Sequence, residues 1–202
     1  DSSESRGLGD VYKRQSLFDT LKTSSVTELG LAKCRLGPGS TGKLAEYVRD
    51  AKAAVARLTL SGNPITNYGD DLSGLKALCE VLPSLKNPIS LDLADCCFKV
   101  AEVNELAKAI DAGAAVASLR CANNPGMVGQ LDYRGRLETP DAHAEVFKEL
   151  TDSLKTSQVT EADFSSCGIG PVALGHLSDW VREATAAVNS LTIDSTGVKQ
   201  VY

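Results

Sequence analysis

Three features are scarce in this 202-residue sequence: aromatic residues, long apolar runs and an excess of positive charge. Aromatic residues make up 5%, so stacking platforms for single-stranded nucleic acid are not expected. The formal net charge is −5, which argues against the basic footprint of a nucleic-acid binder. No apolar run approaches the ~18 to 20 residues that span a bilayer. Neither nucleic acid nor a membrane is therefore an expected partner.

Metal-binding and catalytic patterns are missing as well. The six cysteines form no C-x-x-C pair, and the two histidines, His143 and His176, lie far apart in the sequence. No metal site, cofactor or catalytic group is predicted, because ligands and catalytic partners occur in tighter groupings. Unpaired cysteines at buried positions suit a reducing compartment, so a cytoplasmic location is expected.

The composition that remains is that of an ordinary globular chain. Apolar residues make up 43% and charged residues 23%, which fits one domain or one segment of a repeat array. Residues 1–15 stand apart, since Ser5 to Gln15 resembles a translated sequencing adapter. We therefore expect residues 1–15 to be a non-native tail on what is a fragment of a longer protein, and residues 16–202 to be the domain.

A short alternating apolar segment recurs six times in this domain. Each recurrence has an apolar anchor, a second apolar residue two positions on, and usually Cys or Asn five positions on. The anchors are Leu29, Leu58, Leu91, Leu119, Ala162 and Leu191, with spacings of 29, 33, 28, 43 and 29 residues. Between the segments, apolar residues follow a helical period, which predicts one amphipathic helix for each strand. These helix faces are Leu44/Val48/Ala51, Leu75/Leu78/Leu82, Val103/Leu106/Ile110, Val146/Leu150/Leu154 and Leu174/Leu177/Val181.

A longer repeat lies over the short one. Residues 16–63 align without gaps to residues 149–196, an offset of 133, with 22 identities in 48 positions. Four short repeats therefore make one super-unit, and the sequence stops partway through a second copy. An α/β array of parallel strands covered by helices on one side is the predicted fold, because neither element buries its apolar face alone. The final strand would then leave an open edge, so we expect residues 188–202 to fray or self-associate.

The short repeat resembles the ribonuclease-inhibitor-like leucine-rich repeat. The resemblance rests on the spacing and on the alternation of Cys and Asn at one position, in the order Cys34, Asn63, Cys96, Asn124 and Cys167. Thr196 and Ala162 depart from the pattern. The resemblance implies a right-handed solenoid, a horseshoe segment with its parallel sheet on the concave side and its helices on the convex side. It also implies protein binding rather than catalysis.

One stretch imitates a phosphate-binding loop. Gly37 to Leu44 has the spacing G-x-x-x-x-G-K of a P-loop, but Leu44 stands where Ser or Thr should hold Mg²⁺. The second copy, Gly170 to Leu177, lacks the lysine. The lysine is thus dispensable to the repeat, and we expect the glycines to be loop residues, Leu44 and Leu177 to be core residues, and His143 and His176 to lie at helix starts on the surface.

Alternation along the strands predicts which side chains face away from the helices. The charged members of this row are the candidate partner-binding residues, namely Glu28, Arg57, Asp92, Arg120, Glu161 and Asp163. Tyr133 and Arg134 join them, because the 43-residue spacing hides an insertion over residues 126–139. A long insertion in a regular scaffold either carries function or is disordered.

The function expected from these features is a protein-interaction scaffold that binds an unidentified protein. The alternative is a regulator of a small GTPase, since Ran GTPase-activating proteins have similar repeats. A nucleotide-binding enzyme is the third possibility, and it depends on Lys43.

Overall fold

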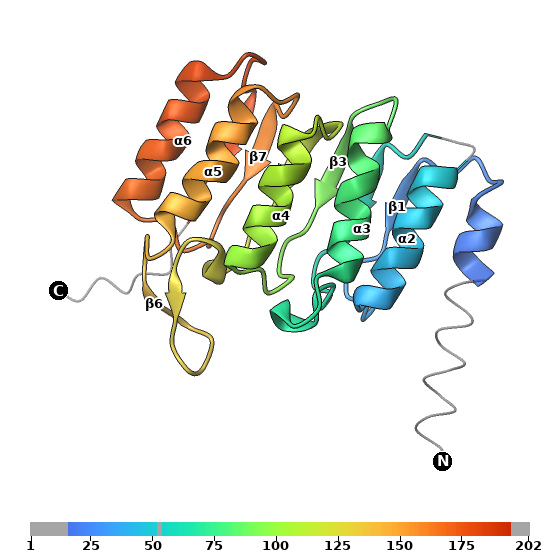
Figure 1. The fold of residues 1–202 in the computed structure, drawn as a ribbon, viewed down its shortest axis with the longest axis horizontal. Helices are drawn as coiled ribbons and strands as arrows, with labels where there is room; N and C mark the ends of the chain where they lie inside the picture. Colours follow the sequence, from blue (N-terminus) through green and yellow to red (C-terminus); the bar gives the residue numbers. More distant parts are fainter. Residues whose placement is uncertain (1–15, 52–53, 195–202) are drawn as a thin grey trace.

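The computed structural model describes residues 16–51 and 54–194. They form an α/β fold with a six-stranded parallel sheet in the order β1-β2-β3-β4-β7-β8. The strands are β1 (Glu28–Gly30), β2 (Arg57–Thr59), β3 (Ile89–Asp92), β4 (Val116–Arg120), β7 (Glu161–Asp163) and β8 (Ser190–Thr192). The helices are α2 (Pro38–Asp50), α3 (Ser73–Val81), α4 (Val100–Asp111), α5 (Ala144–Lys155) and α6 (Pro171–Glu183). Figure 1 shows these helices side by side in one layer over one face of the sheet. The predicted α/β architecture with a parallel sheet is confirmed.

The strand register places the six anchor positions in a single row across the sheet. Leu29 pairs with Leu58, Leu58 with Leu91, and Leu91 with Leu119. Leu119 then pairs with Ala162, and Ala162 with Leu191. A register slip of one residue would turn every apolar side chain to the other face, so this row fixes the core side of each strand. Leu58, Leu91 and Leu119 are at most 2% exposed beneath the helices.

Each strand of the sheet from β1 to β7 is followed by a turn that has a residue with left-handed backbone conformation at the same position. The residue four positions after the anchor has φ between 55° and 70° in all five turns, at Lys33, Gly62, Asp95, Asn123 and Ser166. The turns that carry Cys at the next position have a second left-handed residue, namely Arg35, Cys97 and Gly168. The turns that carry Asn have Pro64 or Pro125 there, and proline cannot adopt positive φ. The Cys/Asn alternation in the sequence is thus an alternation of two turn geometries.

The asparagine of the Asn-type turn joins its own turn to the preceding one. Asn124 is fully buried; its Oδ1 accepts hydrogen bonds from the N–H groups of Cys96 and Phe98, both at 3.0 Å. Its Nδ2 donates to the carbonyls of Leu93 at 3.0 Å and Cys121 at 2.8 Å. One side chain therefore satisfies four buried backbone groups that the turn takes out of the ladder.

The cysteine of the Cys-type turn makes a simpler contact. The Cys96 thiol donates to the Leu60 carbonyl of the preceding turn at 3.4 Å, and the Cys167 thiol donates to the Cys121 carbonyl at 3.1 Å. Cys34 is exposed, contrary to the expectation of a buried thiol. It follows β1, which is an edge strand, so the described chain has no preceding repeat to cover this thiol or to offer it a carbonyl acceptor. Cys97 is exposed too, while the other four cysteines are buried.

The structure corrects two assignments on the helices. The glycines of the P-loop imitation are not loop residues: Gly37 is the N-cap, and Gly39 and Gly42 lie inside α2. On α6, Leu174 and Val181 are about half exposed, at 50% and 47%, rather than buried. The buried row of α6 is Ala173, Leu177 and Trp180, so Leu177 is shared with the prediction while Ala173 and Trp180 take the places of Leu174 and Val181. Leu44 and Leu177 are core residues as expected.

The histidines also differ in part from their prediction. His143 is the N-cap of α5, as expected, but His176 lies in the middle of α6. Both are only partly exposed, and the Nε2 atom of His176 is buried without a hydrogen-bond partner. Neither histidine is a fully solvated surface residue: His143 lines a cavity described below, and the ring of His176 is partly buried.

The insertion of residues 126–139 is an ordered hairpin. β5 (Gln130–Leu131) pairs with β6 (Leu137–Thr139) in antiparallel orientation. The hairpin is fixed at its end by Asp141, whose carboxylate accepts N–H groups of Gly170, Val172 and Ala173 at the start of α6. The negative charge of Asp141 interacts favourably with the N-terminus of α6, and these bonds connect the insertion to the helix layer. The disordered alternative is therefore wrong.

No helix in the described part of the chain is long and apolar enough to cross a bilayer.

Candidate functional site

The face of the sheet opposite the helices is the first candidate site, and we call it the open face. Glu28, Arg57, Arg120 and Glu161 on this face are exposed, and Asp92 and Asp163 are partly exposed. Parallel sheets are normally covered on both faces. Here the helices α2 to α6 lie on one side of the sheet (Figure 1), and the residues named above place charged side chains on the other side.

The register brings three of the predicted residues into one ionic cluster. Asp92, Arg120 and Asp163 occupy equivalent positions on β3, β4 and β7. Arg120 Nε donates to Asp163 Oδ2 at 3.0 Å, and Arg120 Nη1 donates to Asp92 Oδ1 at 3.2 Å. Neighbouring strands lie ~4.8 Å apart, so one guanidinium reaches both carboxylates only because the three residues lie directly opposite one another on adjacent strands. The cluster carries a net charge of −1.

Burial and charge compete within this cluster. Partial burial by itself would lower the pKa of Arg120, but the carboxylates of Asp92 and Asp163 raise the pKa on balance. Partial burial likewise opposes ionisation of Asp163, but hydrogen bonds from Ser165 and Arg120 hold the pKa of Asp163 below its ordinary value. Both effects favour the charged forms of Arg120 and Asp163.

The other candidates on the open face are less tightly joined. Arg57 Nε lies 3.8 Å from Glu28 Oε2, a loose exposed pair. Glu161 pairs in register with Ser118 and Ser190, and among the described residues it has no ion pair. Ala94 and Ala122 follow β3 and β4 at positions that alternation would also place on this face, but both are buried.

Tyr133 and Arg134 lie away from the open face. They form the tip of the β5–β6 hairpin, which projects beyond the end of the helix layer in Figure 1. Tyr133 is 87% exposed, and the Arg134 guanidinium lies 5.0 Å from the centroid of its ring. Such an exposed cation–π pair is worth about 0.5–1 kcal/mol, so it holds the tip together without burying it.

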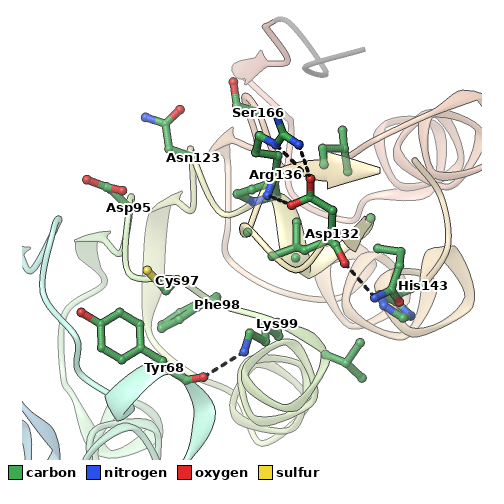
Figure 2. A pocket seen from close by; sticks show the side chains of 18 of the residues that line it. Tyr68, Asp95, Cys97, Phe98, Lys99, Asn123, Asp132, Arg136, His143 and Ser166 are labelled. Atoms are coloured by element: carbon green, nitrogen blue, oxygen red, sulfur yellow. Dashed lines mark hydrogen bonds and ion pairs between the residues drawn. The ribbon is translucent and has the colours of Figure 1, made fainter. Parts of the chain in front are cut away.

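A second site was not identified from the sequence. A cavity of about 1020 Å³ lies at the carboxyl ends of β3 and β4, between the hairpin and the turn at Tyr68 (Figure 2). Besides Tyr68, its polar and aromatic lining includes Phe98, Lys99, Asp132, Arg136 and His143. The signal available in the sequence was the two enlarged spacings of 33 and 43 residues, but spacing alone does not show that the extra residues converge.

The remaining candidates give no catalytic or metal geometry in the described residues. Lys43 lies in the second turn of α2, and its Nζ is 2.9 Å from Glu46 Oε1. In a P-loop the lysine follows a loop that wraps a phosphate, and here the helix already begins at Pro38. Across residues 16–51 and 54–194, no group of three His, Cys, Asp or Glu side chains is close enough to hold a metal ion.

The comparison with known proteins adds no relationship. The sequence matches no protein-family model and no curated protein.

Proposed function

We propose that this chain is a non-catalytic protein-binding scaffold, a segment of a ribonuclease-inhibitor-like leucine-rich repeat whose open face binds a partner protein. In this proposal the array is a right-handed solenoid with the sheet on its concave side and the helices on its convex side. The row of anchor residues across six strands and the alternating Asn and Cys turns support it. The free state of all six cysteines supports a cytoplasmic location.

The observation that carries the proposal is the uncovered face of a parallel sheet. A sheet face that only met water would gain nothing from the ordered Asp92–Arg120–Asp163 cluster, since exposed ion pairs contribute about 0–1 kcal/mol. A charged row with fixed geometry instead supplies specificity and steering toward a complementary surface. Arg is also one of the residue types that dominate binding energy at interfaces.

The size of the open face limits how a partner can use it. Six strands spaced ~4.8 Å apart span about 24 Å, and strands of three to five residues are about 10–16 Å long, so the face projects about 240–400 Å². A standard interface buries ~800 Å² on each partner. A stable partner must therefore also contact surfaces beside the face.

Charge reversal on the open face tests the proposal. The tagged chain is cross-linked to its partner in cells and compared with Glu161→Lys on the open face and with Glu149→Lys, an exposed residue on α5, as the matched control. We expect Glu161→Lys to reduce cross-linking several-fold and Glu149→Lys to leave it unchanged. Equal cross-linking by all three, or loss with the control alone, would contradict the proposal.

The GTPase-regulator alternative is tested separately. In the described residues no arrangement of side chains singles it out, so it stays a prediction. Purified chain is mixed with a GTP-loaded Ran-type GTPase, and phosphate release is measured; acceleration would replace the scaffold proposal with this alternative.

A further inference from the structure

The two irregular spacings of the repeat converge on one place in the fold. The 33-residue spacing adds the turn Asn67–Gly69 after β2, and the 43-residue spacing adds the β5–β6 hairpin after β4. Both insertions lie on the carboxyl side of the strands, and they flank the start of α4 between them. The cavity of about 1020 Å³ is the space that they enclose there (Figure 2). Two departures from a regular array thus build one site.

The turn on one side of the cavity is strained and aims an aromatic ring. Asn67, Tyr68 and Gly69 are three consecutive residues with positive φ, at 47°, 61° and 99°. A tyrosine in this region is rare and costs of order 1–3 kcal/mol, so surrounding contacts must hold it. Thr66 Oγ1 donates to the buried Glu102 carboxylate at 2.8 Å, and Lys99 Nζ donates to the Tyr68 carbonyl at 3.1 Å. These bonds fix the turn to α4 and leave Tyr68 58% exposed at the rim.

The floor and the far side of the cavity combine apolar surface with a fixed cation. Phe98 lies beside Tyr68 in Figure 2 and is almost fully buried, and the partly exposed Leu131 and Leu137 of the hairpin add to the apolar lining. Arg136 Nε donates to Asp132 Oδ2 at 2.9 Å. Hydrogen bonds from the N–H and side chain of Arg136 lower the pKa of Asp132, so the pair stays ionised.

Lys99 is the cavity-lining cation that forms no ion pair among the described residues. Its Nζ donates to the neutral Tyr68 carbonyl, and the buried Glu102 carboxylate in the same helix cap accepts from the Lys99 backbone N–H rather than from its ammonium group. The acidic lining residue Asp132 forms an ion pair with Arg136. Figure 2 shows the Asp95 carboxylate directed outward, away from Lys99. An occupant with an anionic group beside an apolar side chain matches this arrangement, because the ammonium and the partly exposed side chains of Leu131 and Leu137 would otherwise face water.

The cavity is also continuous with the edge of the open face. Asp95, Asn123 and Ser166, the left-handed residues of three successive turns, line its rim. An extended segment of a protein lying on the open face would reach the cavity directly, and the open face alone is too small for a standard interface. We propose that the cavity binds an extended peptide segment of the partner, with an acidic residue at Lys99 and an adjacent aromatic side chain against Tyr68 and Leu131. This inference rests on the proposed scaffold function and names the part of the partner that the edge of the scaffold recognises.

A peptide probe tests the inference without the partner. The peptide N-acetyl-Gly-Glu-Phe-Glu-Phe-Gly-amide is titrated into ¹⁵N-labelled protein to about 2 mM, enough to detect a millimolar site. We expect saturable shifts at the backbone amides of Tyr68, Phe98 and Leu131. Replacing both Glu by Lys in the peptide should weaken binding at least tenfold. N-acetylphenylalanine, the small-molecule arm, should bind at least tenfold more weakly than the peptide.

Two pairs of variants locate the contacts. Tyr68→Gly removes the ring at a position where φ suits glycine, so it folds, and Tyr133→Gly removes a second exposed ring as its control. Lys99→Gln removes the cavity-lining cation, and Lys108→Gln at the other end of α4 is its control. Tyr68→Gly and Lys99→Gln should each weaken the peptide at least fivefold, and the controls should not.

Several results would overturn the inference: no saturable shifts, shifts confined to the open face, insensitivity to Lys99→Gln, or equally tight binding of N-acetylphenylalanine. Glu161→Lys should leave the peptide shifts unchanged whatever it does to partner cross-linking. Failure of the cavity and failure of the open face are therefore distinguished.

Discussion

Replacing Asn124 with alanine should lower the free energy of unfolding by about 4 kcal/mol. The Asn124 side chain is fully buried and makes four hydrogen bonds of 2.8–3.0 Å to backbone groups. Each such bond contributes about 1 kcal/mol net, and removing one side leaves its backbone partner buried without a replacement. The expected loss is a large part of the ~5–15 kcal/mol that stabilises a typical domain.

The matched comparison is Cys167→Ala, at the same position of the next turn. Its thiol makes a 3.1 Å contact with the Cys121 carbonyl and a weaker one with Ser165 at 3.6 Å. A thiol is a weak donor, and the substitution removes one atom from the core, so the expected cost is about 1–2 kcal/mol. The two substitutions should therefore differ by about 2–3 kcal/mol.

Equilibrium unfolding in urea measures both variants, with the fluorescence of the fully buried Trp180 as the probe. Amide hydrogen exchange adds local information, because the N–H groups of Cys96 and Phe98 lose their acceptor only in Asn124→Ala. If the two variants differ by less than 1 kcal/mol, or if these two amides keep their protection, the role assigned to the asparagine turns is wrong.

Three further predictions concern the thiols, the hairpin and the P-loop imitation. Burial raises the pKa of Cys79, Cys96 and Cys167 from 9.0 to about 12, so their contribution to stability is complete below pH 9 and is lost as the pH rises toward 12. Between pH values below 9 and pH 10, each thiol should lower the free energy of unfolding by about 1.4 kcal/mol, as measured by urea unfolding. In Cys79→Ala this pH-dependent loss should be smaller by about 1.4 kcal/mol than in the unchanged protein. Gly168→Ala should cost about 2–4 kcal/mol in thermal unfolding, since its Cβ would lie 2.6 Å from Gly129 N and Pro125 O, whereas Gly113→Ala, with positive φ but open space, should cost about 1 kcal/mol. Lys43→Ala should change stability by at most about 0.5 kcal/mol because its ion pair is exposed, and calorimetry should detect no ATP or GTP binding in either form; micromolar binding lost in the variant would restore the nucleotide hypothesis.

The sequence by itself determined the periodic part of the protein. Leu29, Leu58, Leu91 and Leu119 recur with two-residue alternation and a helical period after each, and a parallel sheet with one layer of helices is what buries both. The charged residues of the open face followed from the same alternation, because side chains on a strand point to opposite faces in turn. These features are local and repeat, so the pattern of apolar residues is enough to predict them.

Tertiary structure decided what the repeat does not specify. Arg120 pairs with both Asp92 and Asp163 because the three residues lie opposite one another on adjacent strands. Alternation predicts which face a side chain is on, but not which residues of neighbouring strands lie opposite one another. The assignment of Leu174 and Val181 as core residues was wrong, because which side of α6 is buried depends on the neighbours packed against it. The cavity between Tyr68 and the hairpin is the clearest case. Residues 31 or more positions apart meet there only because two insertions leave the sheet at the same edge, and periodicity carries no information about where insertions fold.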